Sequence, residues 1–198
     1  QMVRFFSRTE NVRGLFPWDE GSPWLMSGKV FSQYSRDDGR SWSEPRQLIM
    51  SGGGYDETRW APEVTYGVNG ANIEGIPPLE LGGREFLIPC FSHRKAANGK
   101  RRWYSSAFIG TWRGADDDIA WRMTAYSTVD PRLSGNGGDE PSIVRLPDGR
   151  LLMTMRARMD PNDGSTVRSA KFTTTSSDLG ESWAEPRMLR YTDGEQVL

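Results

Sequence analysis

Two oppositely charged residues, Glu140 and Arg156, stand at the ends of a predicted β-hairpin whose turn is Pro147-Asp148-Gly149. Apolar pairs flank the turn, Ile143-Val144 before it and Leu151-Leu152 after it. Because strands joined by a tight turn return to the same end of the sheet, we expect the two charges to meet. A carboxylate can accept a proton, and a guanidinium presents a planar fork to another carboxylate. The pair therefore predicts either a site at a pocket mouth or an ordinary cross-strand ion pair.

A second polar group lies in the segment Tyr55-Asp56-Glu57-Thr58-Arg59-Trp60. Sugar sites combine aromatic rings with a few carboxylate and guanidinium groups. Glu57, Arg59 and Trp60 therefore predict a sugar-binding loop, and a packed position for Trp60 is the alternative. Arg8 is predicted to help bind an acidic ligand, with plain surface charge as the alternative.

Charge and composition exclude several other classes of function. The chain has 25 basic and 26 acidic side chains, and this balance argues against binding of nucleic acid. No apolar run is long enough to span a bilayer. With a single histidine, His93, and a single cysteine, Cys90, we expect no transition-metal site and no cofactor. The acidic run Asp116-Asp117-Asp118 could bind calcium, but a solvated turn is the commoner explanation for such a run.

One motif occurs twice in the chain and organises it. The copies are Ser35-Arg36-Asp37-Asp38-Gly39-Arg40-Ser41-Trp42 and Ser176-Ser177-Asp178-Leu179-Gly180-Glu181-Ser182-Trp183. Serine, aspartate, glycine, serine and tryptophan recur in register, and a Glu-Pro-Arg tail follows each copy. An aspartate in a tight turn accepts hydrogen bonds from backbone N–H groups, and the glycine supplies a positive φ. The motif predicts a hairpin turn whose tryptophan starts the next strand and buries a large apolar surface.

The spacing of tryptophans predicts the architecture. A third, degenerate copy is expected over 114–121, so that Trp42, Trp121 and Trp183 are 79 and 62 residues apart. Such periods suit four-stranded propeller blades with long loops. We therefore predict an all-β fold and a single, partial propeller domain with blades at about 1–62, 63–138 and 139–198, including strands over 63–66 and 121–127. Because propellers close with about 4–8 blades, we expect the chain to be part of a longer protein.

The repeated motif resembles the Asp box, or BNR repeat, of the sialidase superfamily. Members of that superfamily fold as six-bladed β-propellers, so about three blades are expected in this chain. In the superfamily the Asp boxes lie on the rim away from the active site and are structural. The resemblance therefore implies that these motifs build the propeller fold and that the catalytic residues lie in other segments.

The segment 139–156 is similar to a hairpin of bacterial sialidases in which a glutamate opens one strand and an arginine closes the next. The resemblance implies that Glu140 is the general base for a tyrosine nucleophile and that Arg156 is one of three arginines that bind the sialic acid carboxylate. A tyrosine nucleophile sets sialidases apart from glycosidases with two carboxylates.

The sialidase pattern is only partly present in this sequence. An early arginine, a late arginine and the nucleophilic tyrosine would lie outside the chain. The acid/base aspartate belongs in a loop before the first Asp box, where Pro23 stands here. The nearby Asp19 is carried over to that role on the assumption of a different loop length.

The expected function is a retaining, sialidase-like glycoside hydrolase that removes a terminal sialic acid or related acidic sugar from glycans. The alternatives are a non-catalytic glycan-binding or scaffolding propeller and another exo-glycosidase on the same fold, such as an exo-arabinanase. The expected partner is a glycan. The sequence leaves the oligomeric state and the compartment open, and secretion or a periplasmic location is compatible with it.

Overall fold

The computed structural model describes residues 2–11, 26–95, 101–114, 118–159 and 168–190. Its contacts divide the chain into two compact units, Gln1–Ile88 with Phe108–Met123, and Pro89–Ala107 with Thr124–Leu198. These are called unit 1 and unit 2.

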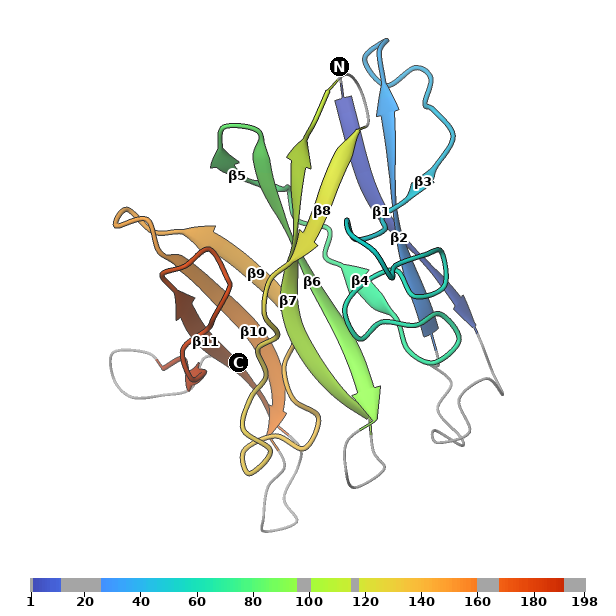
Figure 1. Ribbon diagram of the computed structural model, residues 1–198. Helices are drawn as coiled ribbons and strands as arrows, with labels where there is room; N and C mark the ends of the chain where they lie inside the picture. Colours follow the sequence, from blue (N-terminus) through green and yellow to red (C-terminus); the bar gives the residue numbers. More distant parts are fainter. Residues whose placement is uncertain (1, 12–25, 96–100, 115–117, 160–167, 191–198) are drawn as a thin grey trace. The chain divides into compact units, whose positions relative to one another are not determined.

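The described residues are all-β and form three antiparallel sheets without a helix (Figure 1). The first sheet has the order β1-β2-β3, with β1 over Met2–Asn11, β2 over Met26–Ser35 and β3 over Arg46–Gln47. The second has the order β4-β6-β7-β8, with β5 paired to β6. Its strands are β4 over Ala71–Ile73, β5 over Leu79–Gly82, β6 over Glu85–Lys95, β7 over Arg101–Trp112 and β8 over Ile119–Met123. The third has the order β12-β11-β10-β9. Its strands are β9 over Asp139–Arg145, β10 over Leu151–Met159, β11 over Arg168–Ser176 and β12 over Arg187–Met188.

These sheets confirm the predicted all-β class, with three sheets where about three propeller blades were expected. The predicted turn at Pro147-Asp148-Gly149 is confirmed, and a second tight turn joins β5 to β6. Gly82 and Gly83 take positive φ angles of 102° and 62° between β5 and β6, and Gly149 takes 89° between β9 and β10. The blade boundaries at about 62 and 138 stay a prediction.

The core of each unit comes from strand faces with alternating apolar residues. In unit 2, Leu151, Met153, Met155 and Ala157 of β10 are all buried, and the residues between them are not. This period of two is what a half-buried strand requires. In unit 1, aromatic rings fill the interior, where Trp121 packs edge-on against Phe86 at a centroid distance of 5.6 Å.

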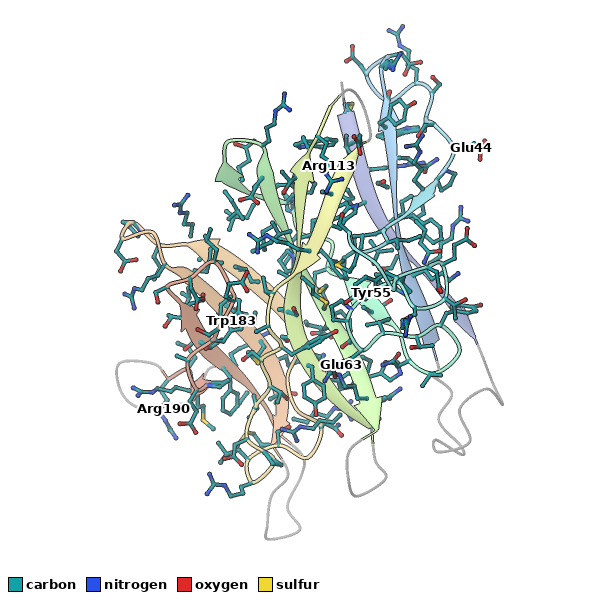
Figure 2. All side chains as sticks on the ribbon, viewed as in Figure 1. Glu44, Tyr55, Glu63, Arg113, Trp183 and Arg190 are labelled. Atoms are coloured by element: carbon teal, nitrogen blue, oxygen red, sulfur yellow. The ribbon has the colours of Figure 1, made fainter. Side chains whose placement is uncertain are left out.

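One predicted strand, over 63–66, is wrong. Ala61, Pro62, Glu63 and Val64 instead form a turn closed by a hydrogen bond of 3.0 Å from Val64 N to Ala61 O. Pro62 fits its second position because proline fixes φ near −65°, and Glu63 takes a φ of +58° at its third position. Proline followed by a left-handed residue is a type II turn, and this local chemistry overrides the alternating pattern that suggested a strand. Figure 2 labels Glu63 on this turn.

The predicted strand over 121–127 is shorter than expected and begins earlier. The regular strand is β8, Ile119–Met123, and beyond it the backbone pairing is reduced to a bond of 2.9 Å from Thr124 N to Ala107 O and an isolated bridge between Ser127 and Ser105. Thr124 takes over part of the pairing with its side chain, because its Oγ1 accepts from Ala107 N at 2.9 Å.

The two Asp-box turns are built as predicted, and both contain the same set of hydrogen bonds. In the first, Asp37 Oδ1 accepts from Ser41 N at 2.9 Å and Asp37 Oδ2 accepts from Ser41 Oγ at 2.6 Å. Ser35 Oγ donates to Asp37 Oδ1 at 2.8 Å and accepts from Gly39 N at 2.8 Å. The second box repeats these four bonds at 3.0, 2.6, 2.7 and 2.8 Å through Ser176, Asp178, Gly180 and Ser182.

Two consecutive left-handed residues give each box its hairpin turn. The φ angles are 56° and 87° at Asp38 and Gly39, and 55° and 88° at Leu179 and Gly180. Such pairs form turns whose twist matches that of the flanking strands. Hydrogen bonds from both Ser41 groups and from Ser35 lower the pKa of Asp37 to about 2, and the same kind of bonds from Ser182 and Ser176 lower that of Asp178 to about 2. Both aspartates therefore stay ionised as acceptors at the centre of their turns.

The tryptophans of the boxes differ from the prediction in one respect. Neither Trp42 nor Trp183 starts a strand, because β3 and β12 begin four residues later, and both rings are only half-buried. Trp183, labelled in Figure 2, donates from Nε1 to Ala125 O at 3.0 Å, whereas Trp42 donates to its own turn at Gly39 O at 3.1 Å. The second box is thus bonded to the chain segment after β8, and Ala125 N adds a bond of 2.8 Å to Gly180 O.

The third, degenerate copy lies partly outside the described residues, which omit 115–117 and with them Asp116 and Asp117 of the acidic run. Trp121 itself occupies the middle of β8 opposite Gly110 and is buried. It therefore differs from Trp42 and Trp183, which both follow a turn and lie outside regular strands.

The two box glycines provide a matched test of what fixes the turns. A Cβ at Gly39 would meet no atom closer than 3.7 Å, whereas a Cβ at Gly180 would lie 2.5 Å from Thr124 Cγ2. Gly39→Ala should cost only the left-handed backbone penalty of about 1 kcal/mol. Gly180→Ala should cost about 2–4 kcal/mol, because overpacking adds to that penalty. Urea unfolding of the two variants measures this, and equal losses would contradict the docking of the second box on Thr124.

Candidate functional site

The hairpin of β9 and β10 carries the predicted charged pair in unit 2. Its turn is closed by bonds from Gly149 N to Leu146 O at 2.9 Å and from Leu146 N to Arg150 O at 2.8 Å. The strands run in regular antiparallel register from Leu151 opposite Arg145 as far as Thr154 opposite Ser142. The next paired residues are Arg156 on β10 and Asp139 on β9. The register therefore shifts by one residue between these two pairs.

This shift is a β-bulge with Glu140 and Pro141 on β9 opposite the single residue Met155 on β10. Glu140 takes a φ of +49°, which L-residues other than glycine and asparagine adopt at a cost. Pro141 has no N–H to give to the ladder, so it fits at a place where pairing is interrupted. Bulges bend a strand and re-aim the side chains beside them.

As a result, two carboxylates reach one guanidinium. Arg156 donates from Nε to Asp139 Oδ1 and from Nη2 to Asp139 Oδ2, each at 3.2 Å. Its Nη2 also lies 2.8 Å from Glu140 Oε1. In a regular strand, successive residues point to opposite faces, so without the bulge only one of the two carboxylates would face Arg156.

The three side chains differ in exposure. Asp139 is 16% exposed, whereas Arg156 is 36% and Glu140 is 40% exposed. Asp139 therefore forms the inner, better-shielded side of the group, and Glu140 and Arg156 present atoms to solvent. We call these three residues the Arg156 triad.

The backbone that leads into the triad is fixed by β7. Trp103 O accepts from Gly138 N at 3.3 Å, and Ser105 Oγ donates to Gly138 O at 3.1 Å. Gly138 packs closely on β10, because a Cβ at this position would lie 2.4 Å from Met155 Sδ and would force that side chain to move. Arg102, which is buried, donates to the carbonyl oxygens of Ser134 and Val129 in the loop before the triad.

The arrangement can accept a proton at Glu140 and bind an anion or hydroxyl groups at Arg156. Two interpretations, a catalytic pair and a structural cross-strand ion pair, share the contact between Glu140 and Arg156. The exposure of both side chains gives a ligand access to them. Asp139, which the sequence did not single out, is also a partner of Arg156, and the available signal was Pro141 beside Glu140, since proline interrupts the pairing of a strand.

The second predicted group lies in unit 1. Glu57 and Arg59 are exposed on a turn where Asp56 Oδ1 accepts from the backbone N of Arg59 at 2.7 Å and of Thr58 at 2.8 Å. These bonds lower the pKa of Asp56, with the Arg59 N–H the larger cause. Trp60 is fully buried against Phe108, at a centroid distance of 5.7 Å. This burial fits the alternative of a packed residue, because a buried ring offers no face to a sugar.

The remaining predicted residues are Arg8 and Asp19. Arg8 is exposed on β1, and its guanidinium lies 4.9 Å from the ring centroid of Phe31 and 5.7 Å from that of Phe6. Asp19 lies outside the described residues. Unit 1 also holds a cavity of about 380 Å³ between β1 and the β5–β6 hairpin, and the predicted site residues that the structure describes do not line it.

A stacked arginine in unit 2 was missed by the sequence analysis. The guanidinium of Arg94 lies 3.9 Å from the ring centroid of Tyr126 and 4.5 Å from that of Tyr104. Burial is the main cause that raises the pKa of Tyr126 to about 12. This phenol therefore stays protonated at neutral pH and is not poised as a nucleophile. Arg94, Tyr104 and Tyr126 are separated by ten or more residues in the sequence, so no local pattern indicated the stack.

His93 lies buried in β6 beside Trp103, and burial is the main cause that lowers its pKa to about 4. Within the described ranges, no three histidine, cysteine, aspartate or glutamate side chains are grouped so as to hold a metal ion. The part of the chain that the structure describes also contains no helix long and apolar enough to cross a membrane.

Backbone strain at Glu140 can be measured by comparing two substitutions that both remove the carboxylate. Glu140→Gly should be more stable than Glu140→Ala by about 1 kcal/mol, because only glycine takes a positive φ without penalty. The same two substitutions at Ser142, which lies two residues further along β9 in regular register, should give the opposite order of stability. Chemical denaturation of the four variants measures both differences. Alanine ahead of glycine at both positions would contradict the bulge.

Comparison with known proteins places the chain among proteins with the repeat seen in its turns. A family model described as the BNR repeat-like domain matches residues 18–196. No curated protein matches the chain. A solved leech intramolecular trans-sialidase, complexed with 2,7-anhydro-Neu5Ac, is 22% identical with a TM-score of 0.48, over 82% of this chain and 19% of that chain. A Hadza microbial sialidase is 16% identical with a TM-score of 0.48, over 85% of this chain and 27% of that chain.

The chain thus spans less than a third of the length of either solved structure. At these TM-scores the two likenesses carry no further weight, and the assignment depends on the family model together with the two Asp-box turns. The expected BNR, or Asp-box, resemblance is confirmed. Because the model covers most of the sequence, this chain belongs to the family of BNR repeat-like domains.

Proposed function

We propose that the full-length protein containing this chain is a sialidase-type glycoside hydrolase that acts on a terminal acidic sugar. One observation carries the proposal: Glu140 Oε1 and Arg156 Nη2 lie 2.8 Å apart, both partly exposed, at one end of the β9–β10 hairpin. The resemblance of residues 139–156 to the sialidase hairpin and membership of the BNR repeat-like family support it.

In this proposal Glu140 accepts the proton of a tyrosine hydroxyl as that oxygen attacks the anomeric carbon of the sugar. A carboxylate is suited to this step, since a phenol becomes a useful nucleophile only when a nearby base takes its proton. The tyrosine would come from elsewhere in the full-length protein. Arg156 binds the carboxylate of the sugar through its planar donor fork and so orients the ring over Glu140.

The other predicted residues have lesser parts in the proposal. Asp19 is the proposed acid/base for the leaving group, and Arg8 is a proposed second cation for the acidic sugar. Glu57 and Arg59, both exposed, are proposed contacts for the rest of the glycan. Trp60 is proposed only as a support for that loop, because Met50 N donates to Trp60 O at 2.9 Å while its ring is buried.

A second candidate is an exo-glycosidase for a neutral sugar. The observation that favours it is the pair of hydrogen bonds from Arg156 to Asp139, which already satisfies part of the guanidinium. A neutral sugar would be bound by its hydroxyl groups, which can donate to carboxylates and accept from the arginine.

Glu140→Gln in the full-length protein tests the proposed base. Turnover of an aryl sialoside should fall about 100- to 10,000-fold, because loss of a general base has effects of that order. Glu185→Gln, at an exposed glutamate after the second Asp box, is the matched control and should leave turnover unchanged. Unchanged turnover in Glu140→Gln would refute the assignment.

Arg156→Ala, measured in the same assay, distinguishes the two candidate substrates. If the substrate is an acidic sugar, the KM of Arg156→Ala for the aryl sialoside should rise strongly. The parent enzyme should then not cleave a neutral aryl glycoside. Cleavage of the neutral glycoside, with a KM little changed in Arg156→Ala, would instead favour the second candidate. Binding of glycans without turnover of either substrate would identify a non-catalytic glycan-binding propeller.

A further inference from the structure

Asp139 is a bidentate partner of Arg156. Its two carboxylate oxygens accept from Nε and Nη2 of the guanidinium at 3.2 Å each, whereas Glu140 Oε1 lies 2.8 Å from Nη2. Asp139 is also the least exposed member of the triad, at 16%. A charge pair shielded from water is stronger than an exposed one, so Asp139 is the partner that Arg156 gives up last.

Asp139 is also held in place by its backbone. The preceding Gly138 is bonded on both sides, by its N–H to Trp103 O and by its carbonyl to Ser105 Oγ. A bidentate carboxylate on a fixed backbone cannot easily turn away when a ligand arrives. An incoming sugar carboxylate must therefore compete with it for the same guanidinium.

The charges of the triad add to the same effect. Asp139 and Glu140 bring two negative charges to this end of the hairpin, and Lys171, which stands opposite Arg156 across the β10–β11 ladder, adds a second positive charge to that of Arg156. A ligand anion that approaches Arg156 is attracted by these cations, but it also meets the repulsion of two carboxylates, and Asp139 already occupies two nitrogens of the same guanidinium. A neutral sugar meets no such repulsion and finds both donors and acceptors for its hydroxyl groups.

We propose that Asp139 is a specificity-determining residue, which competes with a ligand carboxylate for Arg156 and so limits the affinity of this site for acidic sugars while leaving its affinity for neutral ones unchanged. The inference rests on the proposed function, because it takes the Arg156 triad to be the sugar site. It adds a residue and a direction of preference that neither the family nor the resemblance supplies. The bulge at Glu140 is its cause, since the extra residue brings the second carboxylate onto Arg156.

The test compares one sugar in two charge states. N-acetylneuraminic acid is the anionic probe, and its methyl ester is a neutral probe of nearly the same shape. Isothermal titration calorimetry on the full-length protein gives a Kd for each probe. Asp139→Asn keeps the shape of the side chain and removes its charge, and it should lower the Kd of the acid about tenfold, the size expected for one charge about 6 Å away in a partly solvated site.

The Kd of the methyl ester should change less than about threefold in Asp139→Asn, since no net ligand charge is involved. Asp148→Asn is the matched control, because Asp148 also pairs with an arginine of this hairpin, Arg150, at 2.7 Å, but in the exposed turn. It makes the same change in net charge and should leave both Kd values unchanged. If Asp139→Asn does not fold, Asp139→Ser gives the same charge change with a smaller side chain.

The outcomes separate this inference from the proposed function. If the parent protein binds the acid and Asp139→Asn binds it no more tightly, or less tightly, Asp139 merely positions Arg156 and the inference is overturned while the proposed function stands. If neither probe binds to the parent protein or to Asp139→Asn, the triad is not a sugar site and both are overturned. A tenfold gain for the acid alone supports the inference.

Discussion

One extra residue in β9 determines the chemistry of this hairpin. The bulge at Glu140 and Pro141 breaks the regular alternation of the strand, so that Asp139 and Glu140 both reach Arg156 instead of pointing to opposite faces. Of the four non-glycine residues with positive φ in the described part of the chain, three belong to tight turns and only Glu140 lies in a strand. Backbone strain in a strand persists only where the surroundings enforce it. Here Gly138, packed against Met155 and bonded to β7, provides that enforcement.

The rest of the scaffold shows the same dependence on local backbone geometry. Each Asp box places two left-handed residues at the centre of its turn and uses an ionised aspartate to gather the N–H groups that the turn leaves without partners. The second box is further bonded to the segment after β8 through Gly180 O and Trp183 Nε1. The boxes thus shape the turns between strands, and their expected position away from the active site stays a prediction.

Much of this organisation could be predicted from the sequence because it depends on short-range chemistry. The Asp boxes, the Pro147-Asp148-Gly149 turn and the meeting of Glu140 with Arg156 each follow from residues close together in a hairpin. The errors arose where local and longer-range terms compete. Glu63-Val64-Thr65-Tyr66 alternates like a strand, but Pro62 and a left-handed Glu63 turn the chain there. The burial of Trp60 and the part played by Asp139 depend on Phe108 and on β7, whose positions no local pattern reveals.

The Arg156 triad, with the geometry that the bulge gives it, is the proposed sugar-binding site. A crystal structure of the full-length protein soaked with a high concentration of N-acetylneuraminic acid shows whether a sugar binds there. We expect a sugar at the end of the β9–β10 hairpin, with its carboxylate on Arg156 and its anomeric carbon facing Glu140. A sugar bound elsewhere, with Asp139 and Glu140 still on Arg156, would show that the triad is not the sugar site.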